Sequence, residues 1–197
     1  MNSENSVDKS RTRLDTFDAT VGLDRGRSKI VEIIWYLFKM AFILNAFPWP
    51  QGIKHFILKG FGAQIANGVV IKPRVNIHFP WKLKIEEYAW VGEECFILNF
   101  EPVHIGAHAC VSQRTFLCGG NHDFRSPGFE YRNAPITIGA GAWVGAQTFV
   151  GPGVEIGDNT VVAAGSIVTK SLPPNKICLG NPCTANSTRW KDEKETE

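Results

Sequence analysis

The sequence predicts an all-β fold in which the chain winds as a triangular parallel β-helix, after a helical extension and with one insertion looped out of the column. Three observations predict this fold. A β-branched aliphatic residue recurs every six positions over residues 138–168, a small residue usually follows it, and a polar segment interrupts the repeat upstream. A period of six matches neither an α-helix, with about 3.6 residues per turn, nor a free strand. It matches a coil of three six-residue sides whose turns stack as parallel strands.

The first 61 residues are predicted to form a polar tail and a helical extension. Residues 1–13 are polar and of mixed charge, which is unlike a secretory signal peptide. Residues 30–47 are apolar apart from Glu32 and Lys39, and they predict a helix.

This helix is expected to begin after Ser28, a residue type that caps helix N-termini, and to end before Pro48. A membrane span needs about 20 predominantly apolar residues, and a charge near its centre costs several kcal/mol. We therefore expect the helix to pack against the domain or to lie on a membrane surface. Residues 51–61 predict a second, short helix that covers the open end of the column.

The β-helix is predicted over residues 62–185, and residues 186–197 are predicted to be a charged tail. The six-residue step slips by two residues before Ile85 and again before Ile105, which we interpret as bulges at corners. The aliphatics expected to point into the column are Ile65, Ile71, Ile77, Ile85, Val91, Ile97, Ile105, Val111, Leu117, Ile138, Val144, Val150, Ile156, Val162 and Val168.

The repeat stops after Leu117 and resumes near Ile138, so residues 118–135 are predicted to leave the column as a loop. An insertion on a rigid scaffold is the expected place for a functional site. The loop holds His122 and Asp123 in the run GGNHD. By position alone, His122 is equally compatible with an ordinary exposed loop histidine.

Composition excludes several classes of partner. The net charge is +2 and no dense Lys/Arg cluster occurs, so no nucleic-acid partner is expected. Five cysteines without a CxxC pair indicate neither a disulfide framework nor a zinc knuckle, and they favour reduced thiols in the cytoplasm.

His104 stands eighteen residues before His122, so a regular column would place the two on one edge, one rung apart. That spacing raises a metal site as an alternative. A zinc site needs three converging protein ligands, and neither His78 nor His108 falls on this edge, so no metal is expected.

The C-terminal part of the repeat resembles the hexapeptide-repeat acyltransferases. The residues that carry the resemblance are the run AGSIVTK over 164–170, the prolines at 173–174 and the run GNP over 180–182. This resemblance implies that the column winds with a left hand. The run DRGRS over 24–28, before an apolar helix with Trp35, is similar to the colanic acid biosynthesis acetyltransferase group, a relative of the galactoside and maltose acetyltransferases.

The resemblance implies an O-acetyltransferase that uses acetyl-CoA as co-substrate and acts on an acceptor hydroxyl. His122 would be the general base in a direct transfer, a role that suits imidazole at neutral pH. Asn99 matches an asparagine of the colanic acid biosynthesis group and is expected to contact the acceptor, although it could simply serve a turn. His104, as a wall of the acceptor pocket or an exposed strand residue, and Asp123 complete the candidate acceptor contacts.

Coenzyme A is expected to lie along the groove between neighbouring columns. The positions that match its binding site are Trp143, Ala146, Ala164, Thr169 and Lys170. One departure concerns phosphate binding, because relatives carry a basic residue shortly after the run GNP where this chain has Cys183 and Thr184. Whether Arg189 replaces that charge is left open.

Three functions remain compatible with the sequence. The first is acetylation of a sugar hydroxyl in the synthesis of a cell-surface polysaccharide or exopolysaccharide. The second is acetylation of another small acceptor, such as serine or an antibiotic. The third is a β-helix protein that is non-catalytic or metal-dependent. The resemblance also implies a homotrimer with sites between subunits. We expect a cytoplasmic protein, with peripheral contact at the inner face of the membrane left open by the apolar helix.

Overall fold

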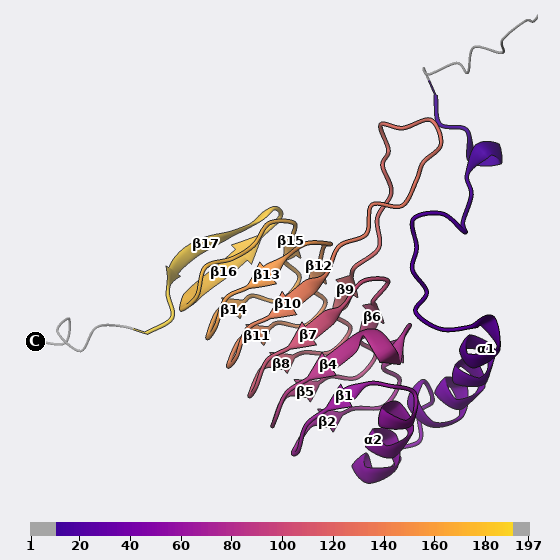
Figure 1. The fold of residues 1–197 in the computed structure, drawn as a ribbon. Helices are drawn as coiled ribbons and strands as arrows, with labels where there is room; N and C mark the ends of the chain where they lie inside the picture. Colours follow the sequence, from indigo (N-terminus) through magenta and orange to yellow (C-terminus); the bar gives the residue numbers. More distant parts are fainter. Residues whose placement is uncertain (1–10, 191–197) are drawn as a thin grey trace, which may run out of the picture.

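The computed structural model describes residues 11–190 and shows a triangular column of three parallel sheets (Figure 1). Most of the polar N-terminal segment and the end of the charged tail, residues 1–10 and 191–197, lie outside the described residues. The chain visits sheet 1, sheet 2 and sheet 3 in turn, and each strand pairs in parallel with the strand one coil away. The parallel β-helix predicted from the six-residue period is confirmed.

Each sheet takes one strand from each of five coils, and sheet 2 holds two further strands. Sheet 1 holds β1 (Gln64–Ile65), β4 (Leu83–Ile85), β7 (Val103–Ile105), β10 (Ile136–Ile138) and β13 (Glu155–Ile156). Sheet 2 holds β2 (Val70–Ile71), β5 (Trp90–Val91), β8 (Cys110–Val111), β11 (Trp143–Val144), β14 (Val161–Val162), β16 (Lys176–Gly180) and β17 (Cys183–Thr188). Sheet 3 holds β3 (Asn76–Ile77), β6 (Phe96–Leu98), β9 (Phe116–Cys118), β12 (Phe149–Val150) and β15 (Ile167–Val168).

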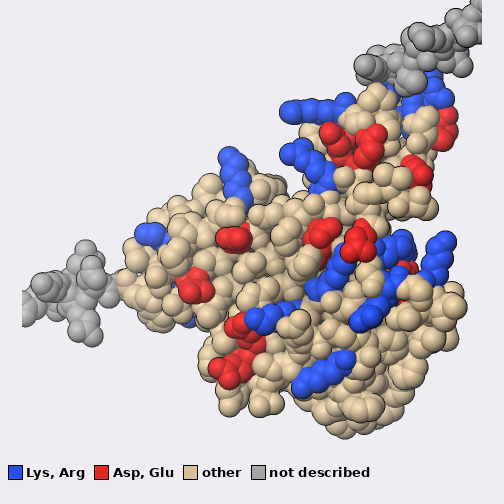
Figure 2. Space-filling view, viewed as in Figure 1, with Lys and Arg blue, Asp and Glu red and all other residues tan. Residues whose placement is uncertain are grey.

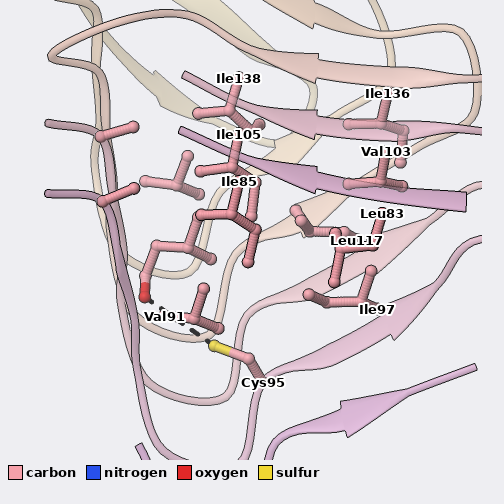
Figure 3. Close-up of a cluster of buried hydrophobic side chains, with 14 of the residues drawn as sticks. Leu83, Ile85, Val91, Cys95, Ile97, Val103, Ile105, Leu117, Ile136 and Ile138 are labelled. Atoms are coloured by element: carbon pink, nitrogen blue, oxygen red, sulfur yellow. Dashed lines mark hydrogen bonds between the residues drawn. The ribbon is translucent and has the colours of Figure 1, made fainter. Parts of the chain in front are cut away.

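The core is the line of aliphatic side chains down the middle of the column (Figure 3). Every aliphatic predicted to point inward, from Ile65 to Val168, is at most 4% exposed. Burying such a side chain stabilises a fold by about 1.5–3 kcal/mol. Stacked coils therefore share one continuous apolar interior, although no single coil encloses a core of its own.

The small residue after each aliphatic is required by close packing of the next coil. A Cβ on Gly145 would lie 2.5 Å from the backbone nitrogen of Ala164, and one on Gly157 would lie 2.5 Å from that of Pro174. The tight corner itself lies two residues later, where Gln147 has a φ of 59° and Asn159 a φ of 56°. The small residue therefore serves mainly to let neighbouring coils approach.

The three sheets meet at three edges of the column, and the irregular segments lie on one of these edges. We call the edges first (sheet 1 to sheet 2), second (sheet 2 to sheet 3) and third (sheet 3 to sheet 1). The two slips of register lie on the third edge, as the 3-10 turn η3 (Pro80–Lys82) and as residues 99–102. The loop 119–135 leaves from the same edge, between β9 and β10. In Figure 1 it extends away from the column.

The helical extension lies beside and under the first coils (Figure 1). A short 3-10 turn, η1 (Leu14–Thr16), is followed by α1 (Lys29–Phe38), which continues as a π-helical turn η2 (Lys39–Ile43). The predicted helix is present, and it ends at Ile43 rather than at residue 47. Within residues 11–190 no helix is long and apolar enough to cross a membrane.

The second predicted helix, α2 (Gln51–Gly60), covers the end of the column. Gln51 exchanges two side-chain hydrogen bonds with the backbone of Ile71, and Lys54 Nζ donates to the same carbonyl at 2.7 Å. The free edge of β2 is thereby paired, as exposed strand edges need to be.

The other end of the column closes with an antiparallel hairpin of β16 and β17, which the sequence did not predict. β16 extends sheet 2 by pairing with β14. Because β17 runs to Thr188, the column extends past the predicted boundary at residue 185.

Candidate active site

His122 lies on the third-edge loop, where an isolated bridge to Tyr131 holds the two arms of the loop together. Its ring nitrogen Nδ1 lies 2.6 Å from the carbonyl oxygen of Phe129. A carbonyl only accepts, so Nδ1 carries the proton, and the neutral ring keeps its lone pair on Nε2. Among the described residues no group hydrogen-bonds to Nε2. The imidazole is thus oriented with its basic nitrogen free to accept a proton.

Three aromatic rings surround the His122 imidazole. Phe129 stacks on it with centroids 4.2 Å apart, Tyr131 lies at 5.0 Å, and Phe17 meets it edge-on at 5.3 Å. Phe17 comes from the N-terminal segment, which is tied to the loop where Arg13 N–H donates to the Pro127 carbonyl at 2.7 Å. Sequence reasoning missed all three rings. The aromatic content of the loop was the only sequence signal for Phe129 and Tyr131, and no signal pointed to Phe17.

Asp123 shapes the loop beside His122. Its backbone N–H donates to the Glu130 carbonyl at 2.8 Å, and its Oδ1 accepts from the Arg125 N–H at 3.0 Å. The carboxylate remains partly exposed next to the imidazole.

His104 does not lie one rung from His122, and that prediction is wrong. In the register of sheet 1, His104 stands beside Lys84 on one side and Thr137 on the other. His122 lies within the inserted loop itself, and β10, which follows the loop, takes the place beside β7 in the next coil. Nε2 of His104 lies 2.9 Å from Oε1 of Glu86. Hydrogen bonds from Lys84 and His104 hold the pKa of that carboxyl at about 2.

Asn99 is fully buried at the third edge, where its side chain contacts the backbone of another coil. Its Oδ1 accepts from the Phe79 N–H at 2.9 Å, and its Nδ2 donates to the Phe79 carbonyl. The Asn99 amide thus pairs both backbone polar groups of the buried Phe79, in the coil below. Sequence reasoning had noted that Asn99 could simply serve a turn.

We therefore expect Asn99→Ala to unfold more easily without changing acceptor binding. Leaving buried polar groups unpaired costs about 1–3 kcal/mol for each group. The check is the thermal midpoint by circular dichroism together with the KM for the acceptor. An unchanged midpoint with a raised acceptor KM would contradict the structural role.

Two of the five residues matched to coenzyme A lie on the second edge. Ala146 and Ala164 are neighbours there, because the Ala146 carbonyl accepts from the Gly165 N–H at 2.8 Å, one coil above. A shallow hollow of about 250 Å³ beside Ala146 is lined by Glu93, Glu94, Gln113, Arg114, Ala146 and Gln147.

Trp143 lies near this edge, on the outer surface of sheet 2. It is 50% exposed, and its indole N–H donates to Ser112 Oγ at 2.9 Å. The ring is held in one orientation with a face open to solvent, as a stacking residue requires.

Thr169 and Lys170 are exposed at the third edge, directly after β15. Arg189, the residue left open as a phosphate ligand, lies elsewhere. Its Nη1 donates to the carbonyls of Gly141 and Asn159, at 2.9 and 3.0 Å, on the first edge. The guanidinium thus joins corners of the column.

His78, at the third edge, is a poor base. Burial, reinforced by the charges of Lys39 and Arg25, lowers the pKa of His78 to about 4. In residues 11–190 no group of three or more His, Cys, Asp or Glu side chains is placed to hold a metal ion.

The predicted site residues are therefore divided between two edges of one column. His122 and Asp123 lie with Thr169 and Lys170 on the third edge, while Ala146 and Ala164 lie on the second. Sheet 3 separates the two edges.

Comparison with known proteins agrees with this architecture. Residues 135–170 match the family model of the bacterial transferase hexapeptide, described as six repeats. The chain is 41% identical over 184 residues to WcaF of Escherichia coli K12, named as a candidate acetyltransferase of colanic acid biosynthesis, covering 91% of this chain and 98% of that protein. It is 32% identical over 131 residues to the galactoside O-acetyltransferase of Escherichia coli K12, covering 64% of each chain.

Solved structures share the fold. A hexapeptide-repeat acetyltransferase from Vibrio cholerae superposes with a TM-score of 0.75 at 20% identity, over 83% of this chain and 93% of that one. A galactoside acetyltransferase in complex with coenzyme A gives 0.73 at 26% identity, over 82% of each chain. The overlap confirms the left-handed winding implied by the resemblance. With 41% identity to nearly the whole of a named acetyltransferase, and with the repeat that defines the family, this chain belongs to the hexapeptide-repeat acetyltransferases.

Proposed function

We propose that this protein transfers an acetyl group from acetyl-CoA to a sugar hydroxyl, in the synthesis of a cell-surface polysaccharide or exopolysaccharide, with His122 as the general base. The observation that carries the proposal is the orientation of the imidazole by the Phe129 carbonyl, which leaves Nε2 free to accept a proton. The named activities of the two enterobacterial relatives support the sugar acceptor.

The proposed chemistry needs no covalent acyl-enzyme. Nε2 of His122 takes the proton of the acceptor hydroxyl while the hydroxyl oxygen attacks the thioester carbonyl. The tetrahedral intermediate then collapses, the C–S bond breaks, and the proton passes from the imidazolium to the departing thiolate. The Phe129 carbonyl holds the ring in one tautomer and stabilises the imidazolium as it forms. Backbone N–H groups would stabilise the oxyanion.

We propose that coenzyme A lies in the groove between neighbouring columns, against Ala146 and Ala164 on the second edge of one column, with Trp143 beside it. Thr169 and Lys170, on the third edge, would lie near its nucleotide end. The galactoside acetyltransferase solved with coenzyme A supports the co-substrate. Small side chains at Ala146 and Ala164 would leave room for a narrow pantetheine arm beside the hollow at Ala146.

The division of these residues between two edges supports a homotrimer with its sites between subunits. His122 on the projecting loop of one subunit would face the second edge of its neighbour. Such an arrangement brings base and thioester together, which one column alone does not do.

Mixing two inactive variants tests this arrangement. We expect His122→Ala, which lacks the base, and Ala164→Trp, which blocks the coenzyme groove, each to be inactive as homotrimers. In doubly purified heterotrimers, co-expression should restore about a third of wild-type activity, because each heterotrimer holds one intact interface in three. The measurement is transfer of radiolabelled acetyl by doubly tagged, co-purified mixtures. No recovery from mixtures shown to contain both subunits would place the site within one subunit.

The acceptor itself is tested by labelled acetyl transfer to a panel of mono- and oligosaccharides, with serine and small antibiotics as competitors. Transfer to a sugar supports the proposal. Transfer only to an amino acid or antibiotic would favour the second function. We place the enzyme in the cytoplasm, where acetyl-CoA is available, with a peripheral contact to the membrane.

A further inference from the structure

Helix α1 is apolar on both of its sides. Its inner side packs on the column through Trp35, which is 2% exposed and whose indole donates to the His78 carbonyl at 2.9 Å. Its opposite side carries a second apolar row at helical spacing, which we call the outer stripe. The stripe consists of Ile30, Ile33, Ile34, Leu37 and Met40, which are 70%, 62%, 43%, 63% and 45% exposed.

A surface helix of a soluble protein normally presents charged residues on its outward side. The outer stripe presents large aliphatics instead, and Phe56 of α2 adds an 80% exposed ring on the same extension. Contiguous apolar surface of this kind marks a contact with another apolar phase.

The charges around the outer stripe indicate which kind of partner surface covers it. Residues 25–60 contain six Lys and Arg, of which Lys39 and Lys54 are buried, but a single acidic residue, Glu32. That carboxylate is already paired with Arg25, with Nη2 and Oε2 2.6 Å apart. Lys29 and Lys59 are exposed on α1 and α2. In Figure 2 the lobe that these helices form, at the lower right, is mostly tan with scattered blue and little red.

We propose that the outer stripe docks on an anionic lipid bilayer, with α1 and η2 lying in the plane of the interface. An apolar row flanked by unpaired cations is the pattern of interfacial helices, which sink their apolar side to the level of the headgroups. The described helices are too short to span the membrane. A second copy of the chain is the weaker occupant, because its lobe would bring the same positive charges.

Docking would also orient the candidate active site. The Arg25 carbonyl, just before α1, accepts from the Trp81 indole on the third edge at 2.8 Å. The same N-terminal segment carries Phe17 to the His122 ring. The third edge would therefore lie near the lipid surface, where it could meet an acceptor held at the membrane. This orientation rests on the proposed function, whereas docking itself does not.

Vesicle flotation tests the docking. We expect the full-length protein to float with vesicles of phosphatidylcholine and phosphatidylglycerol, and weakly or not at all with phosphatidylcholine alone. Leu37→Glu should bind at least about tenfold more weakly, because an apolar contact is lost and a negative charge is gained. The matched control is Leu179→Glu, the same change on an exposed leucine of β16, which should float like wild type. Lys29→Gln should weaken binding about fivefold.

Circular dichroism and light scattering accompany each variant, and Ile30→Glu replaces Leu37→Glu if the latter is misfolded. Wild-type protein that never floats, or Leu37→Glu that floats as well as wild type, would overturn the proposal. A folded Leu37→Glu that loses its oligomeric state, with no vesicle binding by wild type, would assign the stripe to a second copy. Flotation needs no acetyl transfer, so this result stands apart from the activity assays.

Discussion

Replacing His122 with alanine should slow acetyl transfer by about 10²–10⁴-fold while the protein remains folded, because a positioned general base contributes that much to proton transfer. The side chain lies on a projecting loop, outside the aliphatic core, so its loss leaves the column intact. The measurement is the steady-state rate of labelled acetyl transfer to the best sugar acceptor, with acetyl-CoA binding measured separately.

His108→Ala is the matched control, since this exposed histidine stacks on Tyr88 at the first edge. It should transfer acetyl at close to the wild-type rate. Added imidazole should restore part of the activity of His122→Ala, because a small base can enter the space left by the ring. Equal rates for wild type and His122→Ala would remove His122 from the mechanism and leave the base to be sought elsewhere.

The second large effect concerns the packing between coils. We expect Gly145→Ala to lower the free energy of unfolding by about 3 kcal/mol, at the upper end of what one inserted methyl group costs in a packed region. The new Cβ would lie 2.5 Å from the Ala164 nitrogen and 2.7 Å from the Val162 carbonyl oxygen. Both are backbone atoms of the next coil, so no flexible side chain can move aside. The thermal midpoint, followed by circular dichroism at fixed protein concentration, should fall by roughly 6–12 °C.

Gly151→Ala provides the comparison, because Gly151 holds the equivalent place in the following hexapeptide. There the nearest atom would be the Val168 carbonyl oxygen, at an ordinary 3.4 Å. Its midpoint should stay close to that of wild type. Equal midpoints for the two variants would show that the coils can separate at this point, contrary to the packing described.

The column could be predicted from sequence because its signal is local and repeated. Each aliphatic residue from Ile65 to Val168 needs only to point its own side chain inward. A step of six residues then places the next aliphatic residue on the next side of the column. The loop after Leu117 was visible because the repeat stops there. The helices were visible because an apolar run between Ser28 and Pro48 has few other solutions.

Prediction from local residue spacing failed at the inserted loop. Counting residues made His104 and His122 neighbours, but the insertion shifts the register, and the strand pairing places Thr137 beside His104. Asn99 matched an expected acceptor contact in type and position. Whether its amide faces solvent or the Phe79 backbone depends on the coil below, which sequence spacing does not report.

By itself, then, the sequence determined the β-helix, its helical extension, the position of the loop and the choice of His122 as the candidate base. Only the tertiary structure decided which tautomer the Phe129 carbonyl selects, that Phe17 lies against the imidazole, and that the site residues divide between two edges. The physical reason is that burial periodicity is a property of each residue and its near neighbours. Contacts between segments far apart in the chain depend instead on how the coils stack and on where each insertion leaves the column.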